Sequence, residues 1–356
     1  MTSTEDSQSL VQYRCEICNA PYPLGADDVI STCPYCGHTF VVDGGEIKTH
    51  LLLSNRLEKE GVEEVVADWI RFAASKSVGK GVAKDIQLGA PSLQWIPMFR
   101  VKASTQTYHF GADQEGSGDN KRWVKVEGRD SAKITEWVLA RRYAATFGIQ
   151  EFIESLEDEE AKNFDINLTS KAPVLNAEIA DTDASVRAKH LKSERDRAEL
   201  NEKMEKLFDY RLDMETDDCS YVHVPYWMIR YEYHGGTFRV AVSGASGKVV
   251  LGELPVTKTY RVKKWFSSLF MLVAAALLIQ GTPYITYAIL MADSSDGEVF
   301  LIPVVMFILG IILWAGSIQV MGSVLKYEIE LTADAEEREE VFTFGDSLKD
   351  IGGRFT

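Results

Sequence analysis

Four cysteines near the N-terminus place the strongest constraint on how this 356-residue chain can fold. They form two CxxC pairs, Cys15 with Cys18 and Cys33 with Cys36. Two residues between cysteines let one tight turn direct both thiolates at a single ion, and a second such turn completes a tetrahedron. The spacing therefore predicts a tetrathiolate zinc site in a small ribbon, with a disulfide pair or a redox CxxC motif as the alternatives.

The residues that follow each pair fit the same prediction. Asn19 comes directly after Cys18, and Gly37 directly after Cys36. Both residue types tolerate the left-handed backbone that such a turn, called a knuckle, needs after its second cysteine. We expect the zinc to be structural, because four protein ligands leave no open position for a substrate.

Two long apolar segments near the C-terminus carry no charged residue. They run from Trp265 to Met291 and from Val299 to Gly322. A helix needs about twenty apolar residues to span a bilayer, so each segment is long enough. The pattern predicts a two-helix transmembrane hairpin, and a pair of buried core helices is the alternative.

The charges beside these segments predict an orientation. The loop at 292–298 is acidic and holds no basic residue. Basic residues lie outside the hairpin instead: Lys258, Arg261, Lys263, Lys264 and Lys326. Because positive charge favours the cytoplasmic side, we expect a cell-membrane protein with both termini in the cytoplasm. The first thirty residues show no export signal, which agrees with that orientation.

Charge argues against nucleic acid as a partner. The whole chain carries a formal net charge of −15. Between Tyr13 and Val42 the only basic residue of the ribbon is Arg14, against three acidic residues. Nucleic-acid binding depends largely on neutralising phosphates with basic side chains, so we expect no nucleic-acid partner.

The region between the ribbon and the membrane segments mixes helical and strand patterns. Apolar residues at helical spacing predict a helix over 57–77. Alternating residues over 93–111 and 121–128 predict a hairpin, and a helix is expected over 131–156. Acidic and basic residues at three- and four-residue offsets predict a solvated helix over 183–209. Alternation around a Gly235-Gly236 turn predicts three antiparallel strands after His223.

These patterns predict an α+β fold: a small N-terminal zinc ribbon, a mixed α/β cytoplasmic region with antiparallel strand meanders, and a C-terminal two-helix transmembrane hairpin. The expected order of parts is a disordered N-terminus at 1–12, the ribbon at 13–45, a mixed α+β module at 50–160, an acidic, largely helical segment at 161–222, a β meander at 223–256, the two-pass hairpin at 265–322 and an acidic cytoplasmic tail at 323–356.

Motifs of enzymes are absent from the sequence. It contains no HExxH, GxSxG, kinase or Walker pattern, and its six histidines are scattered. Cys219 has His223 four residues later, which would suit a nucleophile pair, but a single buried thiol explains it equally. We therefore expect a protein that is not an enzyme, with no catalytic residues and no small-molecule substrate.

Several of these features occur together in a known group of proteins. The chain combines CPYCG in the ribbon, a "PYW" strand at Pro225 that leads into a short hairpin, and a C-terminal pair of membrane segments. In this it resembles prokaryotic membrane-anchored zinc-ribbon proteins with a TFIIB-type ribbon, sometimes labelled primosomal helicase-like. The resemblance implies zinc at Cys15, Cys18, Cys33 and Cys36, membrane anchoring, and an adaptor-like role without catalytic residues.

These observations lead us to expect a non-enzymatic adaptor or scaffold at the inner membrane face, whose partner is another protein. Two other functions remain open. A rubredoxin-like electron carrier is one, because CPYCG also suits an iron tetrathiolate. The other is an accessory or regulatory subunit of a larger membrane complex, in which the hairpin pairs with a multi-span partner.

Overall fold

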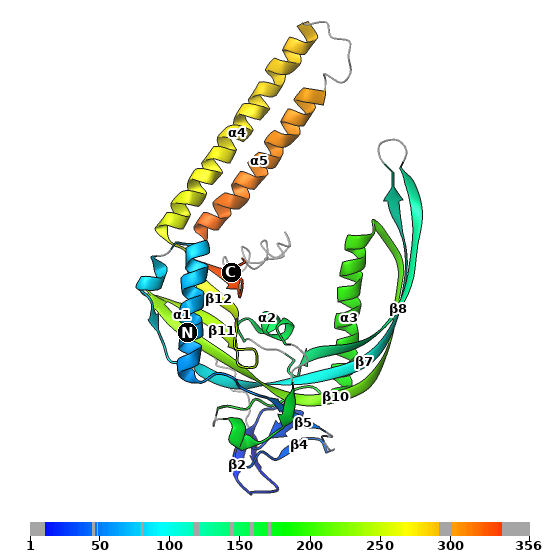
Figure 1. The fold of residues 1–356 in the computed structure, drawn as a ribbon, viewed down its shortest axis with the longest axis vertical. Helices are drawn as coiled ribbons and strands as arrows, with labels where there is room; N and C mark the ends of the chain where they lie inside the picture. Colours follow the sequence, from blue (N-terminus) through cyan, green and yellow to red (C-terminus); the bar gives the residue numbers. More distant parts are fainter. Residues whose placement is uncertain are drawn as a thin grey trace, which may run out of the picture. The chain divides into compact units, whose positions relative to one another are not determined.

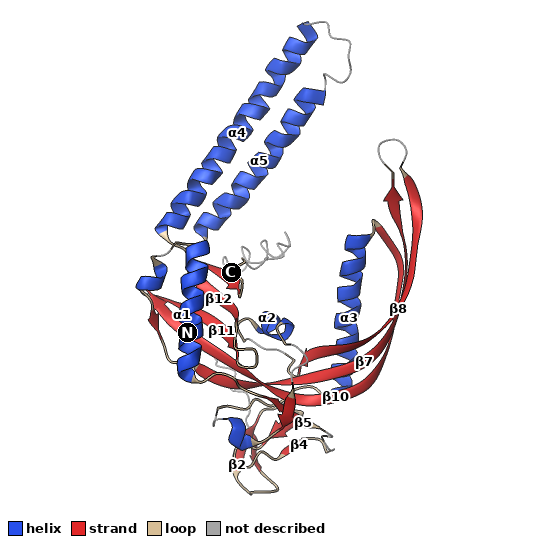
Figure 2. Ribbon diagram, viewed as in Figure 1, coloured by secondary structure: helices blue, strands red, loops and turns tan. Residues whose placement is uncertain are grey.

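The computed structural model has the expected α+β fold (Figures 1 and 2). Its residues form two compact units that interleave along the sequence. Unit 1 consists of Met1–Val65, Ala90–Ile229 and Ala241–Leu251, and unit 2 of Val66–Gly89, Arg230–Val240 and Gly252–Thr356. The structure describes residues 11–44, 47, 49–79, 81–116, 121–142, 146–156, 160–169, 172–291 and 301–336.

The units differ from the sequential division that the sequence suggests. Helix α1 and strands β10, β11 and β12 each contribute residues to both units. The N-terminal residues 1–10, the acidic loop at 292–298 and the tail beyond 336 lie outside the described residues. Disorder is expected over 1–12, but residues 11 and 12 belong to strand β1 (Val11–Arg14), so the expectation is wrong there and stays a prediction for 1–10. The expectations for the acidic loop and for the tail beyond 336 also stay predictions.

The ribbon of unit 1 consists of two antiparallel hairpins. Strands β1 (Val11–Arg14) and β2 (Pro21–Leu24) form the first, and β3 (Ile30–Thr32) and β4 (Thr39–Val41) the second. Between them lies a small core of Cys15, Tyr22, Leu24 and Cys33. Such a core is too small to hold a fold without a metal or a disulfide.

Three long strands form the main sheet of unit 1. Strand β7 (Ser92–Glu115) lies between β8 (Arg122–Leu139) and β10 (Lys206–Tyr233), antiparallel to both. The short strand β5 (His50–Leu53) pairs in parallel with β10 at 221–223, and β9 (Ala161–Asn163) covers the outer side of β5. The predicted hairpin of 93–111 with 121–128 is confirmed, but both strands are longer.

One predicted helix is wrong over most of its length. Residues 131–139 continue strand β8 and pair with 98–106 of β7, and among the described residues of 131–156 only α2 (Ile149–Glu154) is helical. The segment from Ile134 to Leu139 holds several β-branched and aromatic residues, which suit either a short helix or a buried strand. The long ladder with β7 decides between them, because each ladder residue adds cross-strand packing and hydrogen bonds.

The predicted helix over 183–209 is correct in kind but too long. Helix α3 spans Asp181–Lys203, and β10 begins at Lys206. The expectation of a largely helical segment over 161–222 is therefore wrong for its second half, and the β meander expected from His223 has already begun at Lys206. Most of α3 is solvated as expected, and its buried residues are Ala184 and Ala188. Small side chains at these positions let the helix lie close to the sheet.

The sheet of unit 1 is buried on both faces near its centre. One face carries a core that includes Trp137, Phe152, Val224 and Tyr226. The other face carries a second core that includes Phe99, Val138, Tyr221 and the two alanines of α3. Successive residues of one strand alternate between these cores, as the two-residue repeat of a strand requires. Trp137 and Val138 show this alternation directly.

Unit 2 contains parts of four further strands. Strands β11 (Gly236–Ser243), β12 (Val249–Pro255) and β13 (Glu328–Thr332) are neighbours in the order β13-β12-β11, and β6 (Gln87–Leu88) pairs with the end of β10. Strand β13 lies within the acidic tail expected at 323–356, and no pattern in the sequence indicated a strand there. The predicted helix over 57–77 is confirmed as α1 (Lys59–Lys76).

Two long helices form a hairpin in unit 2 (Figure 1). They are α4 (Lys258–Met291) and α5 (Leu301–Leu325). Short 3-10 turns occur elsewhere in the chain, at Val82–Lys84 and Ile166–Thr169. Both are long and apolar enough to cross a membrane. Most of their large apolar side chains, such as Phe270, Leu277 and Ile312, are exposed. A water-soluble protein rarely exposes so much apolar surface, so membrane association fits these helices.

Candidate metal centre

The two CxxC pairs form matched turns in the two hairpins of the ribbon. In the first turn the N–H of Asn19 donates to the carbonyl of Cys15 at 2.8 Å. In the second the N–H of Gly37 donates to the carbonyl of Cys33 at 2.9 Å. Each hydrogen bond closes a tight turn around one CxxC pair. The predicted knuckles are therefore present in both halves of the ribbon.

The residue after each pair has the left-handed backbone that a knuckle needs. The φ angle is 58° at Asn19 and 75° at Gly37. Glycine adopts this region without strain, and asparagine does so more readily than other residues with a Cβ. Position 37 has an additional packing reason for glycine, because a Cβ there would lie 3.1 Å from the Cβ of Ile166.

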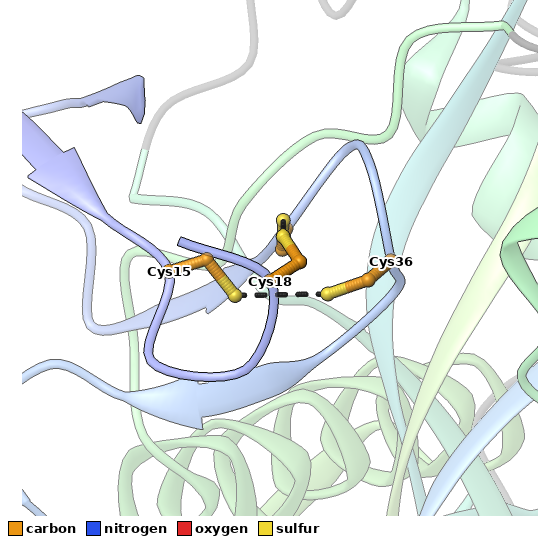
Figure 3. Close-up of side chains that lie close together, drawn as sticks. Cys15, Cys18 and Cys36 are labelled. Carbon is orange, nitrogen blue, oxygen red and sulfur yellow. Dashed lines mark hydrogen bonds between the residues drawn. The ribbon is translucent and has the colours of Figure 1, made fainter. Parts of the chain in front are cut away.

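The four sulfur atoms converge on one point. All lie within 4.8 Å of one another. Cys15 Sγ is 3.6 Å from Cys36 Sγ, and Cys18 Sγ is 3.7 Å from Cys33 Sγ. Figure 3 shows the thiols of Cys15 and Cys36 facing each other. A tetrahedron with metal–sulfur bonds of about 2.3 Å has sulfur–sulfur edges of about 3.8 Å, so the spacing fits one metal ion.

The same distances argue against the alternatives. All five cysteines are free, and a disulfide would bring two sulfurs to about 2.05 Å. Each thiol also pairs across the ribbon with a cysteine of the other knuckle. A redox CxxC motif would instead use the two cysteines of one turn. The arrangement of the four sulfurs can therefore hold a metal ion.

The surroundings shift the pKa values of three of the thiols in different directions. Burial opposes ionisation of Cys15, but hydrogen bonds from the backbone N–H groups of Cys18 and Ile17 outweigh it and lower its pKa to about 7. Burial raises the pKa of Cys33, and it raises that of Cys36 to about 12. Without a cation, four thiolates at this spacing would repel one another. A bound metal ion would remove that cost by coordinating the deprotonated form.

The ribbon is attached to the sheet of unit 1 by a polar clamp. Ile30 of β3 exchanges backbone hydrogen bonds with Ala177, at 2.9 and 3.1 Å. The side chain of Asn176 accepts from the N–H of Thr32 at 3.1 Å and donates to Asp28 at 2.7 Å. Asp28 also accepts from the N–H of Gly25 at 2.8 Å. These bonds fix the second hairpin against a segment about 150 residues later in the sequence.

A chain of hydrogen bonds extends from the ribbon into the sheet. Thr39 Oγ1 lies 2.9 Å from His50 Nδ1, His50 Nε2 lies 2.8 Å from His223 Nδ1, and His223 Nε2 lies 2.9 Å from the carbonyl oxygen of Leu175. The carbonyl can only accept, so His223 donates from Nε2. Burial lowers the pKa of both histidines, so both rings are neutral. His223 Nδ1 then accepts from His50, and His50 Nδ1 accepts from Thr39, whose single hydroxyl proton goes to this nitrogen at 2.9 Å rather than to the carbonyl of Gly37 at 3.2 Å.

Sequence reasoning missed the two histidines of this chain. His50 also stacks on Phe164, with ring centroids 3.9 Å apart. Phe164 in turn lies beside the second knuckle, since a Cβ at Gly37 would be 3.4 Å from its ring. His50 and His223 lie 173 residues apart, and no motif links them. Only the pairing of β5 with β10 brings them together.

The proposed nucleophile pair of Cys219 and His223 is not assembled. Both ring nitrogens of His223 are used by His50 and Leu175. Cys219 Sγ instead lies 3.8 Å from the carbonyl of Asp181. Burial, followed by the nearby Asp181 and Asp218, raises the pKa of this thiol to about 11, which disfavours the reactive thiolate. Cys219 is thus the half-buried single thiol of the alternative interpretation.

The two apolar helices are joined by a polar contact in unit 2. Ser268 Oγ lies 3.0 Å from the carbonyl of Ser317, and Ser317 Oγ lies 3.0 Å from the carbonyl of Ser268. Both serines are buried between the helices. Gly310 lets the helices approach nearby, because a Cβ there would lie 2.6 Å from Ile279. Small and hydroxyl-bearing residues of this kind are typical contacts between helices in membranes.

The fold and the site together define a class: an α+β chain with a four-cysteine, metal-binding type of ribbon and two helices that can cross a membrane. No protein-family model matches the chain, and the comparisons with curated proteins and with solved structures found no match.

Proposed function

We propose that this protein is a non-enzymatic adaptor, anchored in the cell membrane by α4 and α5, whose ribbon is ordered by one structural zinc ion. The convergence of Cys15, Cys18, Cys33 and Cys36 within 4.8 Å is the observation that carries the proposal. Zinc is the common ion for four thiolates in a ribbon, and a closed set of four ligands orders a fold without doing chemistry. The proposal agrees with the resemblance of the sequence to membrane-anchored zinc-ribbon proteins.

The attachment of the ribbon to the sheet supports an adaptor role. Asp28, Asn176 and Thr32 hold the ribbon on a large sheet, so the two can present a continuous binding surface. The tips of both knuckles expose large apolar side chains, Ile17 and Tyr35. Exposed aromatic and aliphatic residues on a rigid turn are suited to contacts with another protein.

Metal analysis of the detergent-purified chain tests this proposal. We expect about one zinc per chain, no visible absorption, and loss of the zinc in Cys33→Ser. The matched control is Cys219→Ser, which removes the one cysteine outside the cluster and should leave the zinc in place. One iron per chain with thiolate-to-iron absorption would overturn the proposal in favour of a rubredoxin-like electron carrier.

The membrane part of the proposal has its own test. We expect the chain to stay in the membrane fraction after washing with carbonate, because two spans cannot be released by high pH. Both termini should be cytoplasmic, since the basic residues beside α4 and α5 favour that side. Labels at the two ends should then be protected in sealed, right-side-out vesicles. Labelling of either end from outside would contradict this orientation, and copurification of a multi-span protein would favour an accessory subunit.

A further inference from the structure

The start of helix α4 in unit 2 carries a dense group of basic side chains. Lys258, Arg261, Lys263 and Lys264, here called the basic collar, lie within the first two turns of the helix. The first three are exposed, and Lys264 is half-buried. No acidic residue occurs from 256 to 291, in a chain whose net charge is −15. The basic collar is therefore a local concentration of positive charge on an acidic protein.

Neighbouring acidic groups do not neutralise this charge. Among the residues that the structure describes, no ion pair involves any member of the basic collar. The acidic residues of strands β12 and β13, which precede α4 and follow α5 in the chain, act instead on Arg239, and Arg239 Nε donates to buried Glu253 at 2.9 Å. Lys264 lies over the ring of Tyr260, 5.4 Å from its centroid, and a ring leaves the ammonium charge in place. The positive surplus is thus open to an anion.

Hydrogen bonds hold the basic collar on an ordered helix. The hydroxyl of Thr257 accepts from the N–H of Tyr260 at 3.2 Å and donates to the carbonyl of Val78 at 2.5 Å, which fixes the first turn of α4. Arg261 Nη2 donates to the carbonyl of Lys326 at 3.3 Å. The start of α4 therefore lies beside the end of α5, at the end of the helix hairpin that joins the strands of unit 2 (Figure 1).

The length of α4 brings the basic collar to the headgroup layer of a membrane. The helix has 34 residues, which is about 51 Å at about 1.5 Å per residue. A bilayer is about 40–45 Å thick with its headgroups, and its hydrocarbon core is about 30 Å thick. When the uncharged residues from Trp265 onward fill the core, the collar lies among the headgroups. Trp265 and Tyr327 follow the collar and α5, both are exposed, and such aromatic residues are typical of this layer.

We infer that the basic collar binds the phosphate groups of anionic phospholipids in the leaflet beside it. Lys258 and Arg261 are three residues apart, so they share one face of the helix and can contact one headgroup together. Lys263 and Lys264 extend the site around the helix. Clusters of basic residues directly beside a membrane helix attract anionic lipids in this way. The inference rests on the proposed membrane anchoring, and it adds the class of lipid that the anchor selects.

Lipid binding to the full-length, detergent-purified protein tests the inference. The probes are phosphatidylglycerol, which is anionic, and phosphatidylcholine, which has no net charge, with the same acyl chains. Native mass spectrometry counts the lipids bound per chain over a titration. We expect phosphatidylglycerol to bind at least about tenfold more tightly, because each basic residue near a membrane surface contributes a factor of about five. Raising ammonium acetate from about 0.1 M to about 0.5 M should reduce this preference, since salt screens the charges.

Double variants locate the binding site. Lys258→Gln with Lys263→Gln removes two exposed charges of the basic collar, and we expect it to weaken phosphatidylglycerol about fivefold or more and to leave phosphatidylcholine unchanged. Lys258→Arg with Lys263→Arg keeps both charges and should bind as the wild type does. The matched control, Arg122→Gln with Lys125→Gln, removes the same charge from exposed positions on β8 in unit 1 and should also leave the lipid preference unchanged.

Each remaining outcome overturns the inference. Equal binding of the two lipids by the wild type would do so, as would an unchanged preference in Lys258→Gln with Lys263→Gln, whose fold circular dichroism checks. Inorganic phosphate that displaces phosphatidylglycerol as well as the lipid itself does would assign the basic collar to free phosphate. A carbonate wash separates the two proposals: a chain that stays in the membrane without any lipid preference overturns only the lipid site, and a chain that carbonate releases overturns the anchor and this inference with it.

Discussion

His50 Nε2 donates a 2.8 Å hydrogen bond to His223 Nδ1 and so joins the segment that follows the ribbon to the longest strand of the sheet. Burial, followed by the charge His223 would carry, lowers the pKa of His50 to about 2, and burial lowers that of His223 to about 4. An unfolded histidine begins to take up a proton as the pH falls toward about 6.5. At that pH both rings are still neutral in the folded protein.

This pair predicts a loss of stability in mild acid. Below the unfolded pKa of about 6.5, the unfolded chain binds protons that the folded chain does not, so the free energy of unfolding falls as the pH falls toward 4. Each histidine contributes up to about 1.4 kcal/mol per pH unit in this window. Denaturant unfolding between about pH 7 and about pH 5 should show a shallower dependence in His223→Gln than in the wild type.

A matched variant separates this effect from other titrations. His190→Gln changes a histidine whose side chain is 70% exposed, and it should leave the slope of the wild type unchanged. Metal content is measured at each pH, and the slopes are compared where all three proteins hold the same amount of metal. Parallel curves for wild type and His223→Gln would contradict the prediction.

Backbone conformation predicts opposite effects at the two knuckles. Gly37→Val should weaken metal retention, because a side chain at φ 75° is strained by about 1–2 kcal/mol and its Cβ would crowd Ile166. Asn19→Gly should retain the metal at least as well as the wild type, since glycine adopts φ 58° freely. Zinc transfer to a chromogenic chelator measures both. Equal transfer midpoints for the two variants would contradict the argument.

In unit 2, Gly252 is predicted to be intolerant of any side chain. A Cβ at this position would lie 2.2 Å from the ring of Trp69, and Trp69 is held by a 3.1 Å hydrogen bond from its Nε1 to the carbonyl of Thr332. Gly252→Ala should therefore lower the free energy of unfolding by about 1–3 kcal/mol. Thermal unfolding followed by circular dichroism measures the change.

Two further variants check the cause of that loss. Gly81→Ala introduces the same methyl group where no atom lies within 4 Å, and its stability should be close to that of the wild type. Adding Trp69→Phe to Gly252→Ala shortens the ring system and should recover part of the loss. An additive double variant would show that the two residues do not collide.

Within the helix hairpin, Ser268 and Ser317 should be energetically coupled. Each hydroxyl donates to the carbonyl of the other serine at 3.0 Å. Contacts of this kind between helices in membranes contribute about 0.6 kcal/mol, and at most about 1.7 kcal/mol. A double-mutant cycle with Ser268→Ala and Ser317→Ala, measured by unfolding in detergent micelles, should show this coupling. Ser267→Ala, at an exposed neighbour, should show none with Ser317→Ala.

Features that depend on local spacing could be predicted from the sequence. The knuckles depend on two residues between cysteines and on Asn19 and Gly37, all of which lie within one turn. Helix α1 follows from apolar residues at helical spacing, and the Gly235 turn lies between β10 and β11 as its flanking alternation indicates. In each case the sequence neighbours supply most of the determining interactions.

Features that depend on distant partners could not be predicted. The segment 131–139 has residues that suit a short helix or a strand, and pairing with β7 decides for the strand. Strand β13 is too short to be recognised without β12 beside it. A groove of about 650 Å³ lined by α2, α3 and the end of β8 exists only because β8 continues as a strand where the sequence pattern predicts a helix.

The metal-binding type of ribbon and the two apolar helices follow from local sequence, because thiol spacing and apolar length are local properties. Which polar groups meet depends on the fold of the whole chain. His50 and His223 lie 173 residues apart, and Asn176 lies 148 residues from Asp28. Such contacts depend on strand register, and register is set by the packing of the whole sheet rather than by the residues on either side.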